Sequence, residues 1–231
     1  MVLKADDGNS EQTLKLVVGQ RVSPGQTVGI NAYRASNSSE RVETTPSLAV
    51  VLQPRLELPN KISDEAIVVY MLLAENNNPD TPGYSRREVQ EAMRCMVSVF
   101  ENRLGFGPSH FGGDVSTTTV KQLIMAKGQV QGFERWPTVG VGQQRLIDEL
   151  LRRANDPSNR RFIEHRQHVQ DALDVARGYV TGMPACRRTD LYGWMTGTSS
   201  ENPGRSFEQV TVFGGQKFYA LSEAFQRSNR R

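Results

Sequence analysis

The sequence predicts a mainly α protein of the α+β class, with a helical domain over residues 61–231 and a short β-type arm over residues 1–60. Two observations lead to this prediction. From Ser63 to about Tyr179, apolar residues recur at spacings of three and four, which is the period of amphipathic helices. Short β-type runs bounded by glycine, proline or serine occupy both ends of the chain and predict strands, including a small C-terminal β-hairpin.

Residues 1–60 differ from the rest in their pattern of apolar and polar residues. Apolar runs at residues 14–18, 27–30 and 48–52 are separated by polar stretches rich in serine, threonine and asparagine. This pattern indicates a few strands or a partly ordered arm. The boundary with the helical domain is expected near residue 60.

The composition limits the classes of protein to which this sequence can belong. The net charge is +3, and no stretch approaches the roughly 20 consecutive apolar residues that span a bilayer, so no integral membrane segment is expected. The first residues lack the apolar region and cleavage site of a secretory signal, which predicts synthesis in the cytoplasm and export by a non-classical route. Arginines concentrate in the second half; a solvated basic face is favoured, and no nucleic-acid partner is expected.

The first predicted helix places a carboxylate at its end. Ser63 is a suitable N-cap, Ile67 and Met71 lie on one face, and Glu75 comes just before the helix-breaking sequence NNNPDTPG. A helix C-terminus carries partial negative charge, so a carboxyl group there is biased toward its protonated form. Glu75 is therefore the candidate acid.

Further helices follow at regular intervals. Ser85 and Glu88 form a capping-box pattern before a long apolar stripe that reaches Leu104. A glycine-rich sequence, LGFGPSHFGGD, is interpreted as a flexible loop or lid. Helices are expected at residues 119–125, 143–154 and 159–179. Residues 209–213 and 218–219, joined through Gly214 and Gly215, predict the hairpin.

The two cysteines, Cys95 and Cys186, are too few for a disulfide-dense scaffold. Two buried thiols are favoured, with a disulfide in an oxidising compartment as the alternative. Glu164, His165 and His168 lie within one helical turn, and a solvated helix face is favoured over a metal site. No metal and no cofactor are expected.

Several short motifs occur in an order that a known family shares. They are a helix ending in Ala74-Glu75, the pair Asn102-Arg103 near the end of the next helix, and the segments Gln129-Val130 and Gly132-Phe133; later come residues 172–178, 189–192 and 213–219. On these motifs, residues 62–225 resemble the cell wall hydrolase family that includes the spore-cortex lytic enzymes. The sequence departs from the family at Val130, at Gln216-Lys217, and in its longer loop over residues 76–84.

The resemblance implies a lysozyme-like fold and cleavage of peptidoglycan between N-acetylmuramic acid and N-acetylglucosamine, with Glu75 as the catalytic acid. Two-carboxylate glycosidases need a second group, and Asp80, Glu91 and Asp114 are the candidates. None is well placed by sequence. A lytic transglycosylase that uses Glu75 alone is therefore favoured, and a hydrolytic muramidase stays open.

The candidate substrate-binding residues are Gln129, Phe133, Tyr192 and Tyr219, because aromatic rings match apolar sugar faces and an amide can bond the N-acetyl group. Trp136 and Trp194 could stack on a sugar, but the interpretation as core residues is favoured for both.

The expected partner is peptidoglycan, met in the periplasm or cell wall. A phage-type lysin and an antibacterial effector toxin, the latter with an immunity protein or secretion-system component as partner, both fit. The alternative functions are a catalytically silent wall-binding module and a cysteine peptidase or amidase that acts on peptide stems through Cys95 or Cys186, with His110 or His165 as base.

Overall fold

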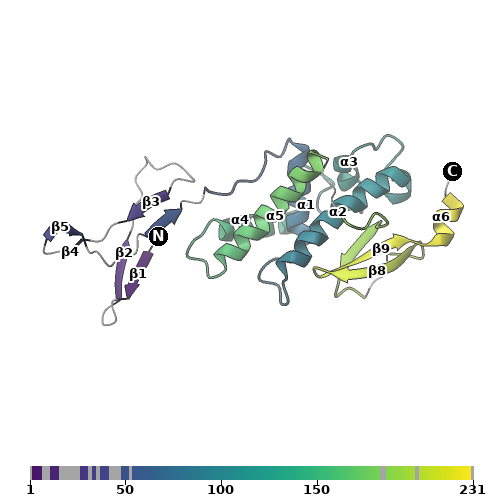
Figure 1. The fold of residues 1–231 in the computed structure, drawn as a ribbon. Coiled ribbons are helices and arrows are strands. Elements are labelled where there is room, and N and C mark those ends of the chain that lie inside the picture. The colour runs from purple at the N-terminus through teal and green to yellow at the C-terminus, as the bar shows by residue number, and fades with distance from the viewer. Residues whose placement is uncertain are drawn as a thin grey trace. The chain divides into compact units, whose positions relative to one another are not determined.

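The protein is described from a computed structural model, which divides the chain into two units, Met1–Arg55 and Leu56–Arg231 (Figure 1). In the first unit the structure describes the backbone of six short strands. Beyond these strands it describes residues 54–182, 186–200 and 203–229. The division falls at Arg55, slightly before the expected boundary at residue 60.

The strands of the first unit form three antiparallel pairs: β1 (Val2–Asp6) with β2 (Glu11–Lys15), β3 (Thr27–Ile30) with β6 (Leu48–Val51), and β4 (Tyr33–Arg34) with β5 (Asn37–Arg41). Two of the expected runs coincide with β3 and β6. The run expected at residues 14–18 overlaps β2 only in part. Its residues 16–18, and residue 52 of the last run, lie outside the described residues.

The second unit is mainly helical and carries a small three-stranded sheet (Figure 1). Its described helices are α1 (Asp64–Glu75), α2 (Arg86–Phe106), α3 (Val120–Met125), α4 (Val141–Ala154), α5 (Phe162–Val180) and α6 (Glu223–Asn229), with a 3-10 helix η1 (Pro108–Phe111). The helices expected from the sequence are confirmed within a few residues, and α6 was not expected. None of the described helices combines the length and apolarity needed to cross a membrane.

Helix α1 lies at the centre of this unit. All of its residues from Ala66 to Leu73 are buried, and it packs against α5, α4, α3 and α2. Its start is fixed by Ser63, whose hydroxyl accepts the N–H of Ala66 at 3.1 Å, as the sequence predicts. A helix buried on every side has little freedom to shift, so the position of its last residue, Glu75, is set by the core.

Helix α2 is joined to α5 by a partly buried ion pair. Arg86 donates two hydrogen bonds of 2.8 Å to Asp171, which is 3% exposed and also accepts from Gln90. The capping box expected at Ser85 is wrong, because the Ser85 side chain makes no cap bond. Glu88 instead accepts the N–H of Gly214 at 3.3 Å and so joins α2 to the sheet.

The segment between α2 and α3 was expected to be a flexible loop or lid. It contains η1, whose Phe111 is 5% exposed and packs into the core. The next helix, α3, begins with a complete capping box between Thr119 and Gln122, which confirms the start expected there.

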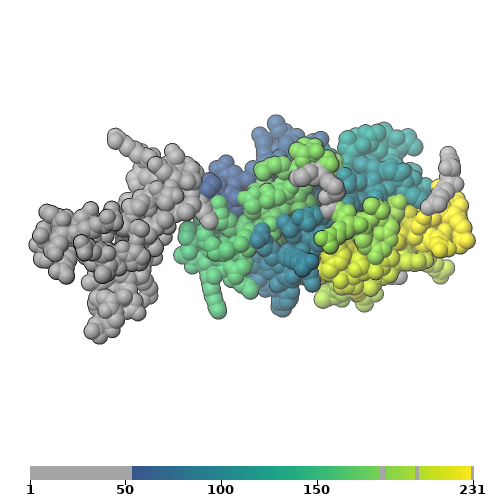
Figure 2. Space-filling model, viewed as in Figure 1, coloured from purple at the N-terminus to yellow at the C-terminus, as the bar shows by residue number. Residues whose placement is uncertain are grey.

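The C-terminal sheet has the strand order β7 (Gly193–Thr196), β9 (Gln216–Leu221), β8 (Phe207–Phe213) and is antiparallel throughout. The hairpin β8–β9 was expected, and β7 was not. Gly214 and Gly215 form the turn of the β8–β9 hairpin, and both have positive φ. The turn lies so close to Asn77 and Glu88 that a Cβ atom added to either glycine would overlap them. Figure 2 shows this hairpin, in yellow-green, against the start of α2.

His165 and His168 contradict the expectation of a solvated helix face, because both side chains are fully buried. They share the inward face of α5 with Val169 and Ala172. The hydroxyl of Tyr84 lies 3.5 Å from Nδ1 of His168, and Asp80 lies 3.3 Å from Nε2 of His165. Burial, helped by His165, lowers the pKa of His168 to about 4.

We predict that replacing Ile67 by Ala lowers the free energy of unfolding by about 2–5 kcal/mol, because the side chain is fully buried in α1. Ile62→Ala is the matched control, since Ile62 is 81% exposed, and it should change stability by less than about 0.5 kcal/mol. Urea unfolding followed by circular dichroism measures both. Equal losses in the two variants would contradict the central position of α1.

We also predict an acid sensitivity that originates at His168. Its folded pKa of about 4 lies below the ordinary value of 6.5, so the unfolded chain takes up a proton first and stability falls as pH decreases from 6.5 toward 4. His168→Met cannot titrate at this position. Its stability relative to the wild type should therefore rise on acidification, as measured by urea unfolding at several pH values. Parallel pH profiles would contradict a buried neutral His168.

Candidate active site at Glu75

Glu75 is held at the C-terminal end of α1 through both its backbone and its side chain. Its carbonyl oxygen, which has no partner within the helix, accepts a hydrogen bond of 2.8 Å from the Gln216 amide in β9. Its Oε2 accepts a longer bond, 3.4 Å, from the indole N–H of Trp194 in β7. Two strands of the C-terminal sheet therefore fix the candidate acid from the side opposite its own helix.

The surroundings of Glu75 favour the protonated carboxyl group. Burial raises the pKa of Glu75, and the N–H of Trp194 lowers it by a smaller amount. Burial penalises the anion because it removes water, whereas the indole donor stabilises the anion. The net shift has the direction expected from the sequence, although burial and not the helix dipole is its main cause.

The adjacent residues Asn102 and Arg103, in the last turns of α2, hold the chain that leads into β7. Asn102 donates to the carbonyl of Leu191 at 2.8 Å, and Nε of Arg103 donates to the carbonyl of Tyr192 at 2.7 Å. These two bonds join consecutive peptide groups to consecutive helix residues. They fix the start of the strand that carries Trp194.

The guanidinium of Arg103 also contacts Gln129, Phe111 and Trp194. Nη1 donates to Oε1 of Gln129, and Cζ lies 5.3 Å from the ring of Phe111 and 5.9 Å from that of Trp194. Burial lowers the pKa of Arg103 to about 10, so the group remains cationic at neutral pH. Carbonyl oxygens and aromatic faces therefore stabilise this cation at the centre of the site.

Two of the predicted binding residues, Gln129 and Tyr192, contact this centre. The oxygen of the Gln129 amide is engaged by Arg103, which directs its NH2 group elsewhere as a donor. The Tyr192 ring stacks with Phe111 at a centroid distance of 6.0 Å and meets Phe106 edge to face at 5.7 Å. Both side chains are only partly buried. The structure thus brings Glu75, Gln129 and Tyr192 into one network through Trp194 and Arg103.

The other two predicted binding residues lie in the core. Phe133 is fully buried and stacks on Trp136, and Tyr219 is 3% exposed. Neither ring presents a face to solvent, so each contributes packing where a sugar contact was expected. Trp136, at 7% exposed, confirms the core interpretation. Trp194 is only partly buried and touches Glu75, a contact that the core interpretation did not foresee.

The three carboxylates considered as partners of Glu75 have other contacts. Asp80 forms ion pairs with Arg153 and Arg161. Glu91 pairs with Arg94 at 3.4 Å. The exposed Asp114 accepts hydrogen bonds from its neighbours in the turn that follows it. Each therefore has a structural role where it lies.

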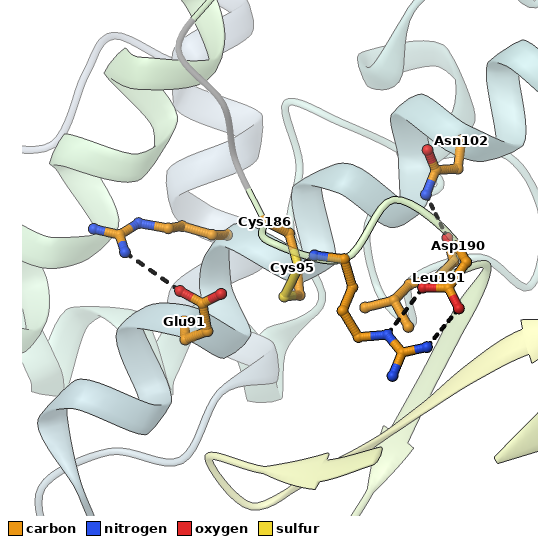
Figure 3. Close-up of a disulfide and its surroundings, with 8 residues drawn as sticks. Glu91, Cys95, Asn102, Cys186, Asp190 and Leu191 are labelled. Carbon is orange, nitrogen blue, oxygen red and sulfur yellow. Dashed lines mark hydrogen bonds and ion pairs between the residues drawn. A yellow bond between two sulfur atoms is a disulfide. The ribbon is translucent and has the colours of Figure 1, made fainter. Parts of the chain in front are cut away.

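The favoured expectation of two free thiols is wrong, because Cys95 and Cys186 form a disulfide (Figure 3). The bond joins α2 to the segment that begins at residue 186. A disulfide sulfur is neither a thiolate nucleophile nor a metal ligand. The cysteine-peptidase alternative therefore has no thiolate nucleophile in the disulfide form. For the same reason, the group of Glu91, Cys95 and Cys186 lacks thiolate ligands for a metal ion.

Comparisons with protein-family models, with curated proteins and with solved structures found no match for this chain. Two of the motifs noted in the sequence have structural roles. Ala74-Glu75 ends the central helix, and Asn102-Arg103 fixes the strand that faces it.

We predict that Trp194→Phe raises the pKa of the Glu75 carboxyl group further, because it removes the donor that stabilises the anion. Carboxyl carbon chemical shifts followed by NMR against pH measure the change. Trp136→Phe removes the other indole at a core position and should leave this titration unchanged. A fall in the Glu75 pKa on removing Trp194 would contradict the assigned bond.

The raised pKa of Glu75 also predicts how the free energy of unfolding depends on pH. The folded pKa of Glu75 lies above its ordinary value, so ionisation costs stability as pH rises through the folded pKa. Glu75→Gln should therefore gain stability relative to the wild type over that range.

Proposed function

We propose that this protein cleaves the glycan strands of peptidoglycan between N-acetylmuramic acid and N-acetylglucosamine, on a lysozyme-like fold with Glu75 as acid and base. The observation that carries the proposal is the state of Glu75. It is a carboxyl group with a pKa raised by burial, at the end of a helix whose residues 66–73 are buried, and it is joined through Trp194 to a network of sugar-compatible side chains.

The first step of the proposed reaction needs a proton donor. The protonated carboxyl of Glu75 gives its proton to the glycosidic oxygen as the bond to the muramic acid carbon breaks, which turns the leaving sugar oxygen into a hydroxyl. A pKa raised toward neutrality keeps a larger share of this carboxyl protonated at the working pH.

The second step needs a base at the same place. Once Glu75 has lost its proton, the N–H of Trp194 stabilises the carboxylate that remains. That carboxylate removes the proton from the attacking hydroxyl. If the attacker is the muramic acid's own hydroxyl, the product is an anhydro sugar; if it is water, the product has a reducing end. The other contacts of Asp80, Glu91 and Asp114 favour the one-carboxylate route.

Gln129 and Tyr192 are the proposed substrate contacts. The NH2 group of Gln129 can donate to an N-acetyl carbonyl, and the Tyr192 ring is partly exposed. Phe133 and Tyr219 are left out because they are buried.

The disulfide supports action outside the reducing cytoplasm, since disulfides persist in oxidising compartments such as the periplasm. This agrees with the expected encounter with the cell wall, whether as a phage-type lysin or as an effector that an immunity protein would restrain.

We predict that Glu75→Gln lowers glycan cleavage by at least about 100-fold, because the amide can neither give nor take the proton. Mass spectrometry of fragments released from purified peptidoglycan measures the activity. Anhydro-muropeptides from the wild type would identify a lytic transglycosylase, and reducing-end muropeptides a muramidase.

Glu91→Gln and Asp114→Asn are the matched controls, since they remove carboxylates that the one-carboxylate route does not use. Both should retain activity. Cleavage of peptide stems, binding to the wall without release of fragments, or full activity in Glu75→Gln would each overturn the proposal.

A further inference from the structure

The disulfide lies at the start of the segment that builds the candidate site. Within ten residues of Cys186, the carbonyls of Leu191 and Tyr192 accept the bonds from α2, and Trp194 reaches Glu75. Figure 3 shows Cys95 and Asn102 on the same helix, both directed at this segment. The segment is therefore attached to α2 at two places, one covalent and one through hydrogen bonds.

The two attachments reinforce each other because of their spacing. Cys95 precedes Asn102 by about two helical turns, so both face the same side of α2. The cysteines are 91 residues apart in sequence, and a crosslink of that span lowers the conformational entropy of the unfolded chain. Without it, the hydrogen bonds of Asn102 and Arg103 alone would have to hold residues 186–192 against α2.

The disulfide can be reached from one side. Cys95 is 1% exposed, but Cys186 is only partly buried, and both line a surface pocket of about 470 Å³. Four arginines and two glutamates share the lining of this pocket: Arg87, Arg94, Arg187, Arg188, Glu88 and Glu91. Glu91, whose carboxylate lies within 4.8 Å of both sulfurs, pairs with Arg94, and Arg188 pairs with Asp190. The N–H of Arg188 also points at the Cys186 sulfur, at 3.4 Å.

We propose that the Cys95–Cys186 disulfide is a positioning element of the active site, which holds residues 186–194 so that Trp194 meets Glu75 only in the oxidised protein. This rests on the proposed function for its effect on activity, but its structural part does not. The protein would be inactive while its thiols are reduced and would become active when a disulfide oxidant forms the bond.

The redox step balances as thiol–disulfide exchange. In reduction, a thiolate of an external dithiol attacks the partly exposed Cys186 sulfur, the bond to Cys95 breaks, and Cys95 leaves as the thiolate. The second thiol of the reductant then displaces Cys186. Two electrons pass to the protein, which takes up two protons, and the dithiol becomes a disulfide.

The test compares the oxidised full-length protein with the protein reduced by dithiothreitol. We expect hydrogen exchange of the amides in residues 187–196 to accelerate by at least about tenfold on reduction, while those of α4 stay protected. Emission from Trp194 should change at the same time. It is read in a Trp136→Phe background, where it is the one remaining tryptophan.

Glycan cleavage should fall by about 100-fold on reduction, since a displacement of about 1 Å has an effect of that size. Reoxidation with oxidised glutathione should restore it. The double variant Cys95→Ala/Cys186→Ala should have the low activity with and without dithiothreitol, which separates loss of the bond from a direct effect of the reagent. Ile147→Val, a mild change in the core of α4, should keep activity and controls for destabilisation.

The outcomes are distinct. Unchanged exchange and activity on reduction, or loss of protection throughout the second unit including α4, would overturn the positioning role. Local acceleration at residues 187–196 in a protein that cleaves no glycan in either form would support the coupling while rejecting the proposed function.

Discussion

The arrangement of this protein depends on the burial of α1. Eight consecutive residues of that helix, Ala66 to Leu73, are inaccessible or nearly so, and the other large helices pack around it. Burial on every side leaves no direction in which the helix can slide without opening a cavity. The carboxyl group at its end is therefore placed by the core, and it inherits the low polarity of the surroundings that raises its pKa.

The residues that contact the Glu75 carboxyl group must be held in place as well, and the C-terminal sheet carries them. Gln216 bonds the end of α1, Trp194 meets the carboxyl, and the Gly214-Gly215 turn fits against Asn77 and Glu88. Arg103 then links this sheet to Gln129. Residues separated by more than a hundred positions thus form one network, whose centre is the Arg103 guanidinium beside aromatic rings.

The second half of this network depends on a covalent bond as well as on hydrogen bonds. The chain from residue 186 to β7 crosses the surface of α2 with few buried apolar residues of its own; Leu191 is the main one. Such a segment is held weakly by packing alone. The disulfide and the Asn102-Arg103 pair compensate for this, which is why the oxidation state bears on the geometry at Glu75.

Local sequence patterns predicted helices α1 to α5, the position of Glu75 at a helix end and the C-terminal hairpin, because periodicity, caps and glycine turns are encoded over a few residues. The other features of the site depend on how these elements pack. The inward face of His165 and His168, the loss of Phe133 and Tyr219 to the core, the pairing of Cys95 with Cys186 and the contact of Trp194 with Glu75 all join segments far apart in the chain. No local pattern records which distant surface a side chain will meet, since that depends on how complete elements pack.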